Sequence, residues 1–168
     1  MTQPRQTITR THLMRLALVF LATMLLTRSV YCAESATSIE SGDLGPVPQE
    51  VAAKVTANKS FGAFKSLTCK IKGKAVSLST DQSTTTWFVT TADACGWGAA
   101  LGPIWLVEDR IGLGATVILS TGGYALSPSA KSHNGLADVI ILAGTASGNA
   151  SKRYTFDGKS YGPHGSEK

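Results

Sequence analysis

The stretch Asp138-Val139-Ile140-Ile141-Leu142-Ala143 is the strongest strand signal in this sequence. Its run of β-branched and aliphatic residues predicts a strand that is covered on both faces. In an antiparallel sheet, a central strand is the one that is enclosed in this way. We therefore expect residues 117–161 to form one antiparallel sheet with residues 139–142 as its central strand.

Shorter runs of β-branched and aromatic residues flank this stretch and predict further strands. Turn residues separate the runs at a spacing of about ten residues, and glycine makes up 17 of the 168 residues. Pro128 is expected to end the strand before it, because proline cannot donate to a sheet ladder. The pattern predicts a mainly β fold, an antiparallel meander in one or two blade-like sheets. The other expected strands are Leu67–Lys72, Ala75–Ser79, Thr84–Thr91, Ile104–Glu108, Ala115–Ser120, Tyr124–Ser127, Lys152–Phe156 and Lys159–Tyr161.

The dipeptide Asp157-Gly158 is the clearest hairpin signal in the chain. Both central positions of a type I′ turn need positive φ, which Asp and Gly tolerate. The strands on either side then alternate, so that Tyr154, Phe156 and Tyr161 point inward. This predicts a two-residue hairpin near the C-terminus whose aromatic side chains belong to the core.

A short amphipathic helix is expected before the first strand, over residues 48–58. Pro48 suits the first turn of a helix, and Val51 and Val55 lie one turn apart on the same face. A helix of this length is not stable alone in water, so we expect it to dock on the sheet. It is the one helix that the sequence predicts for this domain.

The first 32 residues have the pattern of a secretory signal peptide. Residues 16–26 form an apolar run of eleven residues, which is too short for a spanning helix of about 20 residues. Val30 and Cys32 offer a −3/−1 pair for cleavage after Cys32. Arg28 is atypical so close behind the run and leaves an uncleaved membrane anchor as the alternative. The basic residues before the run are Arg5, Arg10 and Arg15.

Three further regions follow the signal peptide in this interpretation. Residues 33–47 are rich in Ser, Glu, Gly and Pro and predict a flexible linker. Residues 48–162 are expected to form a single β-rich domain, and residues 163–168 a C-terminal tail. Such a protein would work in the periplasm or outside the cell and would meet the membrane only during export.

Export changes the charge of the chain. The signal peptide holds four of the 16 basic residues and none of the 11 acidic ones, so the remainder has 12 against 11 and a net charge of +1. The basic character of the whole chain therefore belongs to the signal and gives no footprint for nucleic acid. Lys70, Lys72 and Lys74 alternate along an expected strand and are interpreted as one solvated face.

Export also decides the state of the cysteines. Cys32 would leave with the signal, so Cys69 and Cys95 remain as a single pair in an oxidising compartment, where such a pair forms a disulfide. The chain-entropy model gives about 3.5 kcal/mol of stabilisation for a loop of this size. This is a large share of the roughly 5–15 kcal/mol that stabilises a small domain.

The segments of the C-terminal half, taken together, resemble a known group of proteins. Cys95-Gly96 precedes Pro103-Ile104-Trp105-Leu106, then Gly122-Gly123 and Asn134–Ile140, and Tyr154-Thr155-Phe156-Asp157-Gly158-Lys159-Ser160-Tyr161 comes last. The set resembles small exported uncharacterised bacterial proteins that end in a Tyr-x-Phe-Asp-Gly-Lys-x-Tyr hairpin, and residues 134–140 are similar to an FG-GAP-type propeller blade. The resemblance implies blade-like antiparallel sheets and no particular activity. A domain of about a hundred residues is too small for the four or more blades of a propeller.

The sequence contains no complete catalytic, cofactor or metal motif. His-Glu-x-x-His, Ser-x-x-Lys and Cys-x-x-Cys are absent. The one match to Gly-x-Ser-x-Gly, at residues 158–162, lies in the expected C-terminal hairpin and not between a strand and a helix, where that motif places a nucleophile. Residues 131–138 carry a single carboxylate, whereas calcium takes 6–8 oxygen ligands. Cys95, His133 and Asp138 have the chemistry of a nucleophilic set, which needs a free thiolate beside an imidazole. A disulfide at Cys95 argues against it, so we expect no catalytic residue, no metal and no cofactor.

Trp97 is the candidate contact residue. It stands between Gly96 and Gly98 beside a disulfide cysteine, and an aromatic residue on such a pinned loop is typical of a binding surface. Packing over the disulfide is the alternative. We expect Trp87 and Trp105, which lie within predicted strands, to be core residues.

These observations favour a non-enzymatic binding or inhibitor-type module in the periplasm. Its partner would be a macromolecule, such as an envelope protein, a toxin or a glycan, and not a nucleic acid. One alternative is a cell-envelope hydrolase, although the sequence offers no good pair of nucleophile and base. Another is a structural accessory of the envelope without a discrete ligand.

Overall fold

The computed structural model describes residues 36–98, 101–145 and 148–164. The predicted signal peptide, residues 1–32, lies outside the described residues, as do residues 165–168 of the predicted tail. No helix in the described part of the chain is long and apolar enough to cross a membrane.

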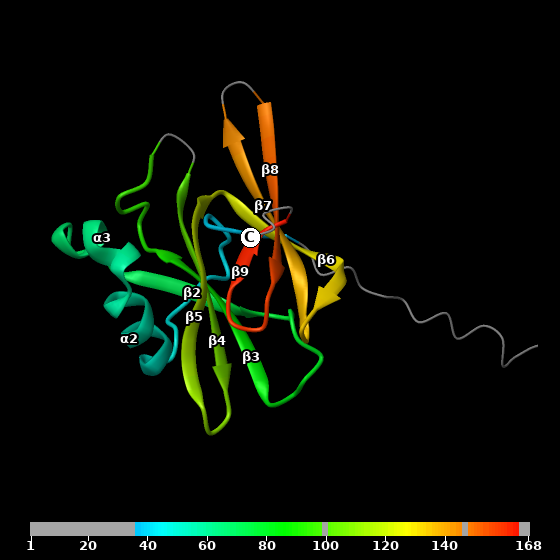
Figure 1. The fold of residues 1–168 in the computed structure, drawn as a ribbon. Helices are drawn as coiled ribbons and strands as arrows, with labels where there is room; N and C mark the ends of the chain where they lie inside the picture. The colour runs from blue at the N-terminus through cyan, green and yellow to red at the C-terminus, as the bar shows by residue number, and fades with distance from the viewer. Residues whose placement is uncertain (1–35, 99–100, 146–147, 165–168) are drawn as a thin grey trace, which may run out of the picture. The chain divides into compact units, whose positions relative to one another are not determined.

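Two antiparallel sheets make up the domain, as expected for a mainly β fold (Figure 1). One sheet has the strand order β2-β3-β4-β5 and the other the order β1-β6-β7-β8-β9. The apolar strand β7 is central, as predicted, but the expected single sheet over 117–161 is wrong because β5 belongs to the first sheet. The strands are β1 Thr37–Ser38, β2 Ile71–Val76, β3 Thr84–Thr91, β4 Gly102–Arg110, β5 Gly114–Gly123, β6 Ala125–His133, β7 Leu136–Thr145, β8 Gly148–Phe156 and β9 Tyr161–Pro163.

The chain passes from one sheet to the other at Gly123. This residue is buried between the sheets, and a Cβ placed on it would meet Ile141 Cγ2 at 2.5 Å and Ile104 Cδ1 at 3.1 Å. Only glycine allows the backbone to approach both sheets so closely. The next residue, Tyr124, already donates its backbone N–H to Leu142 of β7 at 2.7 Å. The crossing therefore needs a single residue, and the sequence pattern of strands alone does not mark it.

Residues 36–47 correct the predicted flexible linker. Thr37 and Ser38 form β1 and pair with β6, and Ile39 is 1% exposed in the core. Gly45 exchanges two backbone hydrogen bonds with Gly73 of β2, at 2.8 and 2.9 Å. This segment belongs to the domain, because it supplies one core residue and pairs with the strands β6 and β2. Its polar composition gave no sign of these contacts. Residues 33–35 lie outside the described residues.

Two strand boundaries also differ from the sequence prediction. Gly73-Lys74 was expected to separate two strands, but both residues lie inside β2 because Gly73 pairs with β3 on one side and Gly45 on the other. Pro128 was expected to end a strand, but β6 continues to His133. The register of β6 against β7 shifts between Pro128 and Ser132, and such an irregularity is where a sheet tolerates proline.

The two-residue hairpin turn lies at a different place from the one that the sequence predicted. Asp157-Gly158 begins a four-residue turn in which Asp157 Oδ1 accepts from the backbone N–H groups of Lys159 (2.8 Å) and Ser160 (2.7 Å). The predicted type I′ turn is therefore wrong there. Asn134 and Gly135, with φ of 49° and 89°, make the two-residue hairpin between β6 and β7 instead.

A first core fills the space between the two sheets. Its buried members come from both sheets and from Ile39, and they include Tyr154, Phe156 and Tyr161, which point inward as predicted. The Phe156 and Tyr161 rings lie 5.3 Å apart, a distance at which two aromatic rings contribute beyond their area.

A second core lies between the helical segment and the outer face of the β2–β5 sheet (Figure 1). The predicted helix is present as α2, Gln49–Ala57, and it buries Val51 and Val55 completely. A 3₁₀ turn, Lys59–Phe61, and a second short helix α3, Gly62–Ser66, follow it and were not predicted. They cover Trp105 of β4, whose Nε1–H donates to Ser60 Oγ at 2.8 Å.

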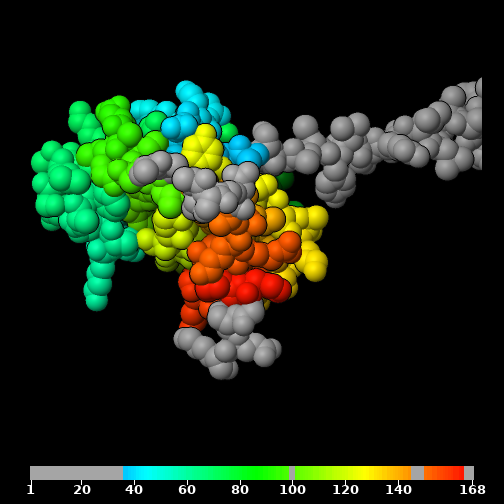
Figure 2. Space-filling view, turned by 90° about the horizontal axis from the view of Figure 1, so that it is seen from above, coloured from blue at the N-terminus to red at the C-terminus, as the bar shows by residue number. Residues whose placement is uncertain are grey.

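Four chain reversals gather at one end of the two sheets, here called the hairpin end. They are residues 77–83, 111–113, 134–135 and 157–160. Contacts between them join the sheets: Ser79 bridges Leu136, and Asn134 donates its side-chain N–H to the Phe156 carbonyl at 2.9 Å. The disulfide-bearing connection between β3 and β4 lies at the opposite end. Figure 2 looks onto that opposite end, where the first described residues (cyan) lie beside residues coloured green.

Candidate functional site

The predicted disulfide between Cys69 and Cys95 is present. Their Cα atoms lie 5.6 Å apart, inside the expected range of roughly 4.4–6.8 Å. The bond ties the turn before β2 to the connection after β3. It leaves neither of these two sulfurs free as a nucleophile.

Trp97 lies in the connection between β3 and β4, and its side chain is partly buried against the domain. Its Nε1–H donates to Thr91 Oγ1 at 2.7 Å, and that hydroxyl donates to the Cys95 carbonyl at 2.7 Å. The indole also lies against Gly102, where a Cβ would come within 2.8 Å of its Nε1. The structure thus shows that Trp97 is half-buried and held in place, and its role as a contact residue stays a prediction. Of the other two, Trp105 is a core residue and Trp87 is half-buried.

The structure brings together two members of the conceivable nucleophilic set and separates the third. His133 Nδ1 and Asp138 Oδ1 are 2.7 Å apart, with the Asp138 side chain 1% exposed and the His133 side chain 46% exposed. Cys95 lies in its disulfide at the other end of the domain. Among the described residues, no group of three potential metal ligands comes together. The Asp138 carboxylate can orient the His133 imidazole, but Cys95 does not lie beside that imidazole as a nucleophile.

The most exposed large apolar side chains occupy the tip of the β4–β5 hairpin. Ile111 and Leu113 are 82% and 79% exposed, on either side of Gly112. The backbone holds them in place: Ile111 N–H donates to the Ser83 carbonyl, and Leu113 N–H donates to the Arg110 carbonyl, both at 3.0 Å. Gly112 has φ of +79°, which the third position of a type II turn requires. Sequence reasoning missed this pair, although aliphatic residues in a glycine turn are unusual enough to be noticed.

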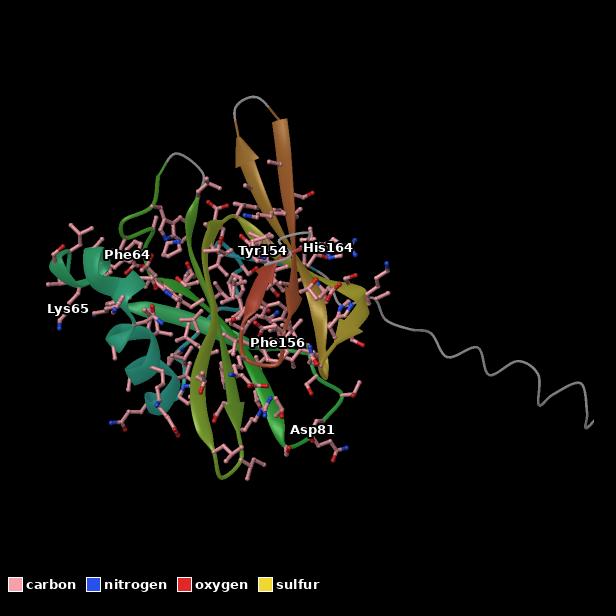
Figure 3. The ribbon with its side chains drawn as sticks, in the orientation of Figure 1. Phe64, Lys65, Asp81, Tyr154, Phe156 and His164 are labelled. Carbon is pink, nitrogen blue, oxygen red and sulfur yellow. A yellow bond between two sulfur atoms is a disulfide. The ribbon has the colours of Figure 1, made fainter. Side chains whose placement is uncertain are left out.

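Two hollows flank this tip. The first, of about 580 Å³, is lined by Glu50 of α2, Thr85 and the turn itself. The second, of about 290 Å³, lies between the two sheets at the hairpin end. Its wall includes Asp81, Glu108, Arg110, Leu136 and the turn residue Asn134. Figure 3 labels Asp81 at this end of the molecule, beside the start of β3.

Two carboxylates and one guanidinium line the second hollow. Glu108 is buried at 7% exposure, and Arg110 donates to its Oε1 at 2.8 Å. Asp81 stands at the exposed rim, where it accepts hydrogen bonds from the Ser83 hydroxyl (2.7 Å) and backbone N–H (2.9 Å) and from Thr84. These bonds, with a smaller contribution from the Arg110 charge, hold the pKa of Asp81 below its usual value. The rim therefore stays negatively charged into the acidic range.

The charges of the described residues are divided between the two parts of the domain. Four carboxylates and one guanidinium line the two hollows, a net charge of −3. The other described residues carry ten basic and five acidic side chains, a net charge of +5. The hairpin end is therefore negative on a domain that is otherwise positive. The five charged residues at the hollows are Glu50, Asp81, Glu108, Asp109 and Arg110.

Comparison of the chain with models of protein families, with curated proteins and with solved structures found no match.

Proposed function

We propose that this protein is a non-enzymatic binding module that docks a macromolecular partner, most simply another protein, on its hairpin end. The observation that carries the proposal is the exposed pair Ile111 and Leu113. Single exposed aliphatic residues are ordinary on protein surfaces, but two on one tip, with a hollow on each side, form an apolar anchor. In the free domain both side chains carry the cost of contact with water, which a partner would relieve.

The turn is also ordered before any partner arrives. Two backbone hydrogen bonds and a left-handed glycine fix the positions from which Ile111 and Leu113 project. Ordering a flexible loop on binding costs roughly 0.5–1.5 kcal/mol for each immobilised side chain in addition to the backbone cost. A turn that is already formed avoids the backbone part of this cost, which supports a role in recognition.

The proposal includes export, so that the partner would be met in the periplasm or outside the cell. Two observations support this: the pattern of the first 32 residues, and a disulfide of a kind that persists in oxidising compartments.

A cell-envelope hydrolase is the second candidate, and one contact favours it. The buried Asp138 carboxylate orients the half-exposed His133 imidazole, as in a general base. A substitution separates the candidates. Release of envelope fragments that stops in His133→Gln and persists when Ile111 and Leu113 are both replaced by Ser would support the hydrolase.

Site-specific photo-crosslinking tests the binding module directly. The exported protein is made with p-benzoylphenylalanine in place of Leu113 and irradiated in the producing cells. We expect one dominant protein adduct at position 113. The matched control carries the same group in place of Leu67, which is 57% exposed but lies beyond α3, away from both hollows. No adduct at 113, or the same adducts at 67, would refute docking on the hairpin end.

A further inference from the structure

We infer that the partner presents a basic side chain, a lysine or an arginine, which enters the 290 Å³ hollow beside the tip and pairs with Glu108 and Asp81. The apolar surface around that side chain would cover Ile111 and Leu113. This inference rests on the proposed function and adds to it the chemistry of the partner, a protein with a cationic surface.

The size of the hollow decides what enters it. Sites for drug-sized molecules and cofactors usually measure about 300–1,000 Å³ and enclose most of the ligand. This hollow lies at the lower limit of that range and opens between two turns. It has room for one extended side chain that reaches in from a partner surface outside. The exposed pair at its mouth then provides the surrounding contact area.

The arrangement of charge decides which side chain fits. Asp81 lies at the rim and Glu108 lies deeper, so a long side chain would meet one carboxylate on entry and the other at its end. Arg110 neutralises one of the two, which leaves a net charge of −1 in this hollow. A lysine or arginine has the length, the sign of charge and the apolar stem to follow this path.

The wider field favours the same partner. The net charge of −3 at the two hollows would attract a cationic surface and orient it toward the hairpin end. It would repel the phosphates of a nucleic acid. A glycan would find no exposed large aromatic side chain in the described part of the chain on which to stack, since the exposed large apolar residues there are aliphatic.

A second copy of this chain is the competing occupant, because the rest of the domain carries a net charge of +5. A second copy would also have to cover the two aliphatic side chains of the tip with apolar surface of its own. Leu67, the remaining exposed large apolar residue in the described part, stands alone beyond α3. We therefore assign the hollow to a different protein and make self-association an outcome of the test.

The first experiment uses the complex captured through position 113. A carbodiimide couples a carboxylate directly to a lysine amine within ion-pair distance and forms an amide with the net loss of water. Mass spectrometry of the treated complex should find Asp81 or Glu108 joined to a partner lysine. A product that joins either residue to a lysine of a second copy of this chain would overturn the inference.

The second experiment measures association rates of the purified complex, and it also detects an arginine, which forms no carbodiimide product. We expect Asp81→Asn to slow association about tenfold at low ionic strength, with the difference disappearing at high salt. Glu108→Gln should mainly speed dissociation. The control is Asp43→Asn, an exposed carboxylate paired with Lys74 outside both hollows, which should leave the rate unchanged.

The experiments distinguish a failure of the binding function from a failure of the basic side chain in the hollow. If no protein is captured at position 113, the binding function itself is wrong. If a protein is captured, but neither an amide product nor a salt-dependent effect of Asp81→Asn appears, then docking stands and the basic side chain is refuted.

Discussion

Gly123 of β5 lies directly against Ile141 of β7, so that a single added methyl group would come within 2.5 Å of Ile141 Cγ2. This contact joins the two sheets at the place where β5 leads directly into β6. We expect Gly123→Ala to destabilise the domain by about 1–3 kcal/mol, the usual cost of overpacking a core. Chemical denaturation measures it. Gly122→Ala is the matched control, because the atom nearest to a Cβ placed there is the Gly102 carbonyl oxygen, 4.0 Å away. A loss of stability of equal size in that variant would contradict the packing explanation.

Removal of the disulfide should lower stability without changing the fold. Replacing Cys69 and Cys95 together by Ser is expected to cost about 2–4 kcal/mol, because the closed loop restricts the unfolded chain. Thermal unfolding of the double variant checks this, with the circular dichroism spectrum as the control for the fold. An unchanged melting temperature of the double variant would show that the disulfide does not stabilise the domain.

Phe156 and Trp97 should respond differently to truncation. Phe156 is 1% exposed and contacts Tyr161, so Phe156→Ala should cost about 3–5 kcal/mol. Trp97 is half-buried and keeps one side-chain hydrogen bond, so Trp97→Ala should cost less. Unfolding free energies of the two variants give the comparison. If Trp97→Ala proves as costly as Phe156→Ala, Trp97 is a core residue and its predicted contact role is lost.

Asp81 should titrate below the usual value of 3.8 for its carboxyl pKa, because the Ser83 and Thr84 hydrogen bonds favour the charged form. A lowered folded-state pKa means that the unfolded chain binds the proton more readily. Its stabilising contribution is therefore present above the unfolded pKa and is lost as the pH falls through the folded pKa. The Asp81 carboxyl ¹³C shift, followed from pH 5 to pH 2, measures the midpoint. A midpoint at or above 3.8 would show that these bonds are not formed in solution.

Periodicity and apolar runs predicted the strands and the helix because they report which residues must leave water. β7 is the central strand of its sheet, as expected for a strand that is apolar on both faces. The helix α2 docks through Val51 and Val55. The division into two sheets escaped this reasoning. The chain leaves the first sheet at Gly123, where the two sheets approach closely, and the sequence does not show whether a glycine in a strand lies near a neighbour or in open space.

Local chemistry was ambiguous where one dipeptide suits two turns. Asp-Gly fits a type I′ hairpin, but the Asp157 carboxylate instead caps the two backbone N–H groups that follow. Ile39 was overlooked because a single apolar residue in a polar segment gives no periodic signal.

The candidate site was predicted least well. The cysteine pair followed from compartment and parity. The tip at Ile111 and Leu113 was missed because exposure of an aliphatic residue depends on what the fold leaves uncovered, and the hollow beside it is formed by segments distant in sequence.

The pairing of Thr37 with Leu126 has a kinetic consequence. Contacts between residues so far apart in sequence make folding slow, since the chain must close a long loop before the contact can form. The N-terminal segment reaches its place on β6 only after more than two thirds of the chain is available, and until then the sheet edge that it covers stays open. A chain that delays its last contacts in this way stays unfolded for longer after synthesis.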